Sequence, residues 1–255
     1  MNKPKVFISH ISEEGRIAQL IKSQVSADFL GMIDVFVSSD QVSISVGSKW
    51  LDEVDEALKD AQIELVLCSK HSVSRPWINF EAGAGWVKGI PIVPICHTGM
   101  RPVDLPIPLN MLQGIEASDP AGWQRVYNLL ASKLGSAIPN ADFNGLISDV
   151  RTFEQDYGLL GEVTAAVRAL VQLLPPLAPM FQPNPAHRRA NGDVSDLVLD
   201  KMRGHLDLLQ SKGMLAYAIG GNKMVVATSG GGNMIELNIE MKPPYYAIAP
   251  RVEHQ

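Results

Sequence analysis

The most constraining feature of the sequence is an alternation of short apolar runs with stretches of helical periodicity over residues 5 to about 134. The runs KVFIS, IDVFV, ELVLCS and IPIVPIC each have the length of a strand, and a weaker run covers 111–116. A helix at about 51–61 is predicted between the second and third strands. Strands that alternate with helices form a parallel sheet covered on both faces. The sequence therefore predicts an α/β domain over residues 1–135.

The loops that follow the first three strands are the candidates for a binding site. In an open parallel sheet, ligands bind at the carboxyl ends of the strands. Residues 9–13, 38–48 and 70–77 all leave this edge of the predicted sheet. We therefore expect functional residues in these loops or at the start of the helix that follows the third strand.

A long helix is predicted beyond a linker at 135–145. Apolar residues step by three and four from Phe143 to Leu174, which predicts one helix over 146–175. Two interpretations of this apolar stripe remain open. The helix packs on its own chain, or residues 147–174 pair with the same helix of a second chain.

A Pro-rich segment at 175–187, for which we expect no regular structure, leads to a final module at 191–255. A helix from about Asp193 to Lys212 is predicted there, followed by strands at 215–219, 223–228 and 234–241 joined by GGN and SGGGN turns. The pattern indicates a small α+β module with a sensing or assembly role. Its helix region carries more acidic than basic residues, which argues against nucleic acid as a partner.

The composition argues against several other classes of protein. The formal charge of −5 does not suggest a nucleic-acid surface. Cys68 and Cys96 lie in apolar runs, so we expect buried, reduced thiols. No signal-peptide pattern and no apolar window of membrane-spanning length occurs, which predicts a cytoplasmic protein without membrane contact. The histidines do not have metal-site spacing, so no metal is expected.

The segment PWINFEAGAGW contains the clearest candidate for a functional group. Trp77 and Glu81 are four residues apart, so they share one face of a helix that begins at the ligand edge of the sheet. Gly83 and Gly85 are poor helix formers and suggest close packing against a neighbouring backbone or a ligand. The spacing alone also fits a solvated glutamate beside a tryptophan that anchors the start of the helix.

Four segments in order resemble the bacterial branch of the TIR (Toll/interleukin-1 receptor) family. They are KVFISH, DVFVSSDQVSISVGSKW, ELVLCSKHSVSRPWINFEAGAGW and IPIVPICH, and the resemblance covers residues 5 to about 134. It implies a flavodoxin-like fold with a five-stranded parallel sheet. The family includes enzymes that split NAD⁺ into nicotinamide and ADP-ribose, or a cyclic form of it. It also includes adaptors that only bind other TIR domains.

The resemblance also implies roles for individual residues. Glu81 matches the glutamate that active members carry on the helix after the third strand, and Trp77 matches an aromatic position that lines the substrate pocket. The expected substrate-binding residues are Ser9, His10, Ile11, Ser38, Asp40, Trp50 and Trp77. Many relatives carry Asp directly after the second strand, where this chain has Ser38, with Asp40 two residues on.

One carboxylate is sufficient for the chemistry that the resemblance implies. Nicotinamide leaves the ribose as a neutral molecule, so no general acid is needed, unlike in ordinary glycosides with their two carboxylates. Positive charge develops on the ribose in the transition state. A carboxylate at Glu81, held close to the sugar, would stabilise that charge electrostatically.

Three functions remain open. The leading hypothesis is an NAD⁺ glycohydrolase or ADP-ribosyl cyclase that needs no cofactor and is activated by self-association in bacterial defence. The second is a non-catalytic scaffold that assembles through its TIR domain and the helix at 147–174. The third is a nucleoside-transferase relative that acts on a smaller nucleotide. The two-domain layout suggests that a small molecule or protein activator binds the C-terminal module.

Overall fold

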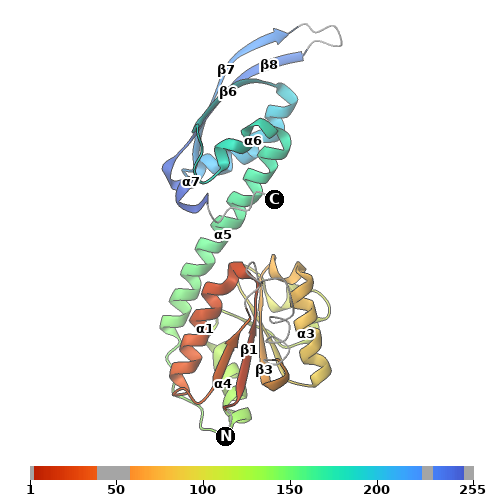
Figure 1. Ribbon diagram of the computed structural model, residues 1–255, viewed down its shortest axis with the longest axis vertical. Coiled ribbons are helices and arrows are strands. Elements are labelled where there is room, and N and C mark those ends of the chain that lie inside the picture. Colours follow the sequence, from red (N-terminus) through yellow and green to blue (C-terminus); the bar gives the residue numbers. More distant parts are fainter. Residues whose placement is uncertain (1–2, 39–57, 226–231, 250–255) are drawn as a thin grey trace. The chain divides into compact units, whose positions relative to one another are not determined.

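The computed structural model describes residues 3–38, 58–225 and 232–249 (Figure 1). The chain divides into two compact units, Met1–Tyr157 and Gly158–Gln255, which we call the N-terminal and C-terminal units. Helix α5 (Asn144–Leu173) contributes its first half to one unit and its second half to the other.

The N-terminal unit contains the predicted five-stranded parallel sheet. The strands are β1 (Lys5–Ser9), β2 (Asp34–Val37), β3 (Ala61–Cys68), β4 (Ile92–Cys96) and β5 (Ile115–Glu116). They lie in the order β2-β1-β3-β4-β5, and every neighbouring pair is parallel. The α/β fold class predicted from the sequence is therefore confirmed.

The sheet is covered by helices on both faces (Figure 1). Helices α1 (Gly15–Asp28) and α4 (Pro120–Leu134) pack with the first half of α5 on one face, and α3 (Pro76–Lys88) packs on the other. The helix expected at 51–61 lies mostly outside the described residues, which include only its end at 58–60. The fifth strand is shorter than the predicted run at 111–116 because Leu109–Met111 forms a 3-10 turn.

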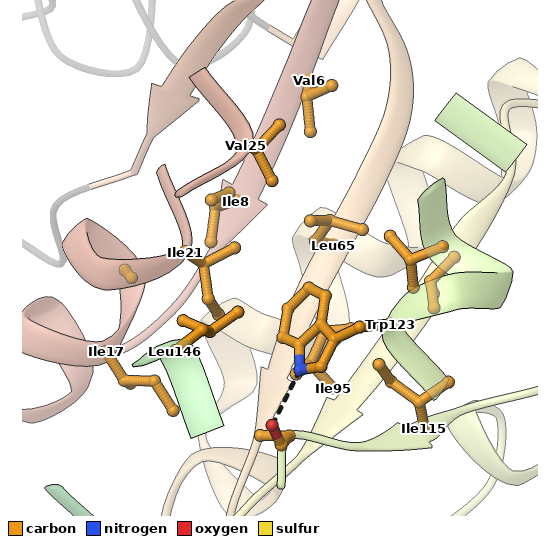
Figure 2. Packing of buried hydrophobic residues seen from close by; sticks show 14 of the residues in the cluster. Val6, Ile8, Ile17, Ile21, Val25, Leu65, Ile95, Ile115, Trp123 and Leu146 are labelled. Atoms are coloured by element: carbon orange, nitrogen blue, oxygen red, sulfur yellow. Dashed lines mark hydrogen bonds between the residues drawn. The ribbon is translucent and has the colours of Figure 1, made fainter. Parts of the chain in front are cut away.

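A fully buried tryptophan packs in the larger hydrophobic cluster of this unit, between the sheet and helices α1, α4 and α5 (Figure 2). Trp123 from α4 packs against the sheet, and its indole Nε1 donates a hydrogen bond of 2.8 Å to the carbonyl oxygen of Ala117. Ile17 and Ile21 of α1 lie close to Leu146 of α5 in the same cluster. The first half of α5 is thus part of the core of this unit.

The apolar stripe of α5 is buried by its own chain. Phe153 and Tyr157 belong to the core of the N-terminal unit, whereas Leu160 and Val167 belong to the core of the C-terminal unit. The interpretation in which the helix packs on its own chain is therefore confirmed. The stripe is not available for pairing with a second copy.

The C-terminal unit is an α+β module, as predicted. Strands β6 (Arg189–Ser195), β7 (Leu215–Val225) and β8 (Gly232–Met241) form an antiparallel sheet in the order β6-β8-β7. Helix α6 (Asp196–Ser211) packs on the sheet, within the predicted helix at 193–212. A short helix α7 (Pro243–Ile248) follows β8.

Two local predictions for this unit were wrong, and one strand was not predicted. The GGN segment is not a turn, because β7 continues through it with a register shift between Ile219 and Asn222. Strand β6 was not predicted because its sequence, RANGDVS, is polar, and backbone pairing with β8 forms it. The Pro-rich segment contains a 3-10 helix over Pro175–Phe181, stabilised by the burial of Leu177, Met180 and Phe181.

Both cysteines are buried free thiols, as predicted. Within residues 3–38, 58–225 and 232–249, no helix combines the length and the apolar content needed to cross a bilayer.

We predict that Phe153→Ala destabilises the protein by about 3–5 kcal/mol, because it removes a buried aromatic ring from a packed core. Phe153 is 2% exposed, and its ring stacks on Tyr157. The free energy of unfolding, measured by urea denaturation, checks this. Phe80→Ala is the matched control, since Phe80 is 62% exposed and should change stability little. Equal effects of the two substitutions would contradict the core role of α5.

Candidate functional site

Helix α3 brings Glu81 to the carboxyl edge of the sheet. The helix begins with Pro76 at its first position, where the missing N–H costs no hydrogen bond. One helical face is buried against β3 and its neighbours and consists of Ile78, Glu81, Ala82 and Gly85. Glu81 therefore points into the protein and not into solvent, which contradicts the interpretation of a solvated helix carboxylate.

Two donors from different elements hold the Glu81 carboxylate in place. The Ser9 hydroxyl, at the end of β1, donates to Oε2 of Glu81 at 2.5 Å. The Trp77 indole Nε1, one turn earlier on α3, donates to Oε1 at 2.7 Å. Hydrogen bonds to a charged acceptor are shorter and stronger than those between neutral groups. A carboxylate that is 0% exposed is thus fixed in one orientation.

An aromatic surface lies beside this carboxylate. Trp77 is half-buried, and its ring lies 5.3 Å from the ring of Phe80, centroid to centroid, with the planes inclined by 31°. Phe80 is largely exposed. Sequence reasoning missed Phe80, although its three-residue spacing from Trp77 on a helix was a usable signal.

The other predicted site residues have varied positions. Ser38 is buried, and its backbone N–H donates to the carbonyl oxygen of Ile8 at 2.9 Å. His10 is buried as well. Ile11 packs in an apolar cluster with Val66 and Ile78. Asp40 and Trp50 lie outside the described residues. The structure therefore brings together Ser9, Trp77 and Glu81.

A second buried polar cluster, missed by sequence reasoning, connects the ends of three strands. Oε1 of Glu14 accepts a hydrogen bond of 2.7 Å from the Ser69 hydroxyl and lies 3.0 Å from Nε2 of His97. Oε2 of Glu14 accepts the backbone N–H of Ile11 at 3.3 Å. Glu14, Ser69 and His97 are all buried. This cluster fixes the loop that follows Ser9.

Helix α5 contributes to the same cluster. The Tyr157 hydroxyl lies 3.4 Å from the Ser69 hydroxyl, and the backbone N–H of Thr98 donates to Oε1 of Glu154 at 2.9 Å. Burial and the nearby Glu14 raise the pKa of Tyr157 above its usual range, so this phenol stays neutral. The signal available in the sequence was the polar residue directly after each of two apolar runs, Ser69 and His97.

Another carboxylate, Glu64, lies on the face of β3 that packs against α3. Burial, and to a smaller extent the negative charge of Glu81, raise the pKa of Glu64 from its ordinary value to about 8. Glu64 therefore holds a proton at neutral pH. The described part of the chain contains no group of three or more His, Cys, Asp or Glu side chains that could hold a metal ion.

Comparison with known proteins identifies the N-terminal unit. Residues 6–130 match the family model described as TIR domain. Among curated proteins, none matches this chain. The match begins in β1, includes the other four strands of the parallel sheet and ends in α4. It contains Ser9, Trp77 and Glu81. Residues 6–130 of this chain are therefore a TIR domain.

Proposed function

We propose that the TIR domain is an NAD⁺ glycohydrolase or ADP-ribosyl cyclase in which Glu81 is the catalytic carboxylate. The observation that carries this proposal is the buried Glu81 carboxylate, held by Ser9 and Trp77 at the carboxyl edge of the parallel sheet. This edge is where open α/β folds bind their ligands. NAD⁺ is the substrate, and no cofactor takes part.

The reaction breaks the bond between the ribose C1′ and the pyridinium nitrogen. The bonding electrons leave with nicotinamide, which becomes neutral, and positive charge develops on the ribose. Water then attacks C1′ and releases a proton to give ADP-ribose, or an adenine nitrogen of the same molecule attacks to give the cyclic product. Only the developing positive charge needs stabilisation by the protein.

The surroundings of Glu81 suit that task. A carboxylate fixed in advance and shielded from water interacts more strongly with a developing cation than one that water can screen. The donors from Ser9 and Trp77 orient the carboxylate before the substrate arrives. Trp77 is half-buried and Phe80 is exposed, so we infer that the nicotinamide ring approaches from this aromatic side.

A second candidate function is a TIR scaffold without turnover. It is favoured by exposed apolar side chains at the end of α3, where Trp86 is 48% exposed and Val87 is 88% exposed. Such side chains often mark contact surfaces between proteins. A nucleoside transferase would use the same carboxylate, and turnover of free nucleosides in place of NAD⁺ would identify it.

Self-association and a defence role belong to the same proposal. With the stripe of α5 buried, contacts between chains would use the surface of the TIR domain. The C-terminal unit has a core of its own, which suits a separate module that binds a small molecule or protein activator. A neighbouring TIR domain that excludes water from the site would strengthen the field of Glu81.

We expect Glu81→Gln to lower the release of nicotinamide from NAD⁺ by about 100-fold or more, because it removes the charge that stabilises the transition state. Product chromatography measures the rate, and circular dichroism checks the fold. Glu116→Gln, at an exposed carboxylate on β5, is the matched control and should keep wild-type activity. Turnover by Glu81→Gln within a few-fold of wild type would rule out the assignment.

Two substitutions of Trp77 distinguish the contribution of its aromatic ring from that of its N–H donor. Trp77→Ala should raise KM by roughly tenfold, because stacking on an aromatic side chain contributes about 1–3 kcal/mol. Trp77→Phe should restore KM but leave kcat reduced by roughly tenfold, because the hydrogen bond to Glu81 is missing. Steady-state kinetics measures both constants. Unchanged kinetics in both variants would mean that Trp77 only anchors the helix.

We also expect the activity per molecule to depend on protein concentration. Dilution should lower the specific activity over the same range in which light scattering shows the protein becoming monomeric, because a site closed by a neighbour reopens to water. Constant specific activity down to a demonstrably monomeric sample would show that the TIR domain works alone.

A further inference from the structure

Glu64 is a buried acid for which the described part of the chain offers no hydrogen-bond partner. It lies in the middle of β3 and is 0% exposed. Within the described residues, neither of its carboxyl oxygens has a hydrogen-bond partner. Its neighbours in register are Phe7 on β1 and Ile92 on β4, both apolar. Buried polar groups are nearly always hydrogen-bonded, so this acid is unusual.

Helix α3 leaves room for the Glu64 side chain. A Cβ atom placed on Gly85 would lie 2.1 Å from Oε2 of Glu64, far below any tolerated contact. Glycine is among the poorest helix formers, and an unpartnered buried acid is costly as well. Stability alone therefore does not account for this pair of residues.

Gly85 also relates Glu64 to the candidate catalytic group. Glu81 and Gly85 are four residues apart on the buried face of α3, so Glu81 lies one turn from the point where the helix contacts Glu64. Among the described residues, Glu81 is the charged group that acts on Glu64. The strands on either side, β1 and β4, present only the apolar Phe7 and Ile92 at this level.

We propose, on the basis of the NAD⁺-cleaving function proposed above, that Glu64 is a positioning residue whose proton limits the buried pair of Glu64 and Glu81 to one negative charge, carried by Glu81, and so sets the alkaline limit of the reaction. Two ionised carboxylates in one buried space repel each other. Loss of the Glu64 proton to solvent would leave two negative charges in this buried space, and their repulsion would displace Glu81 from Ser9 and Trp77. The oriented negative charge that the developing ribose cation needs would then be lost.

The test compares the pH dependence of kcat/KM in wild type and Glu64→Gln. Glutamine has the shape of the protonated acid and cannot ionise. The pKa of Glu64 in the free protein is about 8, so wild-type kcat/KM should fall about tenfold between neutral pH and pH 9, one unit above that value. Glu64→Gln should match wild type at pH 6.5 and keep that rate at pH 9. Glu116→Gln, with its exposed carboxylate, should follow the wild-type profile.

The titration of Glu64 can also be followed through the stability of the protein, without an activity assay. Its pKa is raised above the ordinary 4.5 of an unfolded chain, so between pH 4.5 and 8 the folded state binds the proton more tightly. Wild type should therefore lose stability relative to Glu64→Gln as pH rises through this window, with no further change above it. Thermal unfolding at pH 5 and pH 8.5 gives the two differences in Tm, and the larger is expected at pH 8.5.

The outcomes separate the two proposals. If the rate falls equally above neutral pH in wild type and Glu64→Gln, the role of Glu64 is overturned while NAD⁺ cleavage stays intact. A difference in Tm that does not change with pH would have the same meaning. A folded Glu64→Gln protein that is inactive at pH 6.5 would overturn that role too. No loss of NAD⁺ with wild type at any pH would contradict the proposed function itself. The role of Glu64 would then fall with it, even where the change in Tm occurs.

Discussion

Strand β3 lies between β1 and β4 and is covered on both faces, so the residues from Ile63 to Cys68 are all buried. Side chains alternate along a strand, which divides these residues into two sets. Ile63, Leu65 and Leu67 pack in the large cluster with α1, α4 and α5. Glu64, Val66 and Cys68 face α3. The sheet thus separates an apolar side that stabilises the fold from a side that contains buried acids next to the candidate site.

Apolar periodicity predicted the TIR domain well because its three central strands, β1, β3 and β4, are buried on both faces. Continuous apolar runs such as ELVLCS need no tertiary information to be recognised. The C-terminal unit was predicted less accurately for the opposite reason. Strand β6 forms from a mainly exposed, polar segment whose pairing with β8 is specified by contacts far away in the sequence. The bulge in β7 contains two glycines that locally resemble a turn.

The sequence predicted those site residues that combine a functional side chain with a helical spacing. Trp77 and Glu81 follow from their positions on one helix, whereas the contact of Glu81 with Ser9 depends on how α3 packs on β1. Glu14 and His97 were missed because charged or ionisable side chains are expected, from sequence alone, to be exposed to solvent. Glu14 can be buried because it contacts His97, which is 83 residues away in the sequence, and Ser69, which is 55 residues away. No local pattern indicates such partners.

The sharing of α5 between the two units has a consequence for how small an autonomous fragment of this protein can be. The segment that matches the family ends at residue 130, yet the core it builds is completed by Leu146, Val150 and Phe153. A fragment cut at residue 135 would leave the apolar surface beneath α5 open to water, which favours aggregation. The smallest fragment that keeps this core whole extends through Tyr157, inside the helix that continues into the next unit.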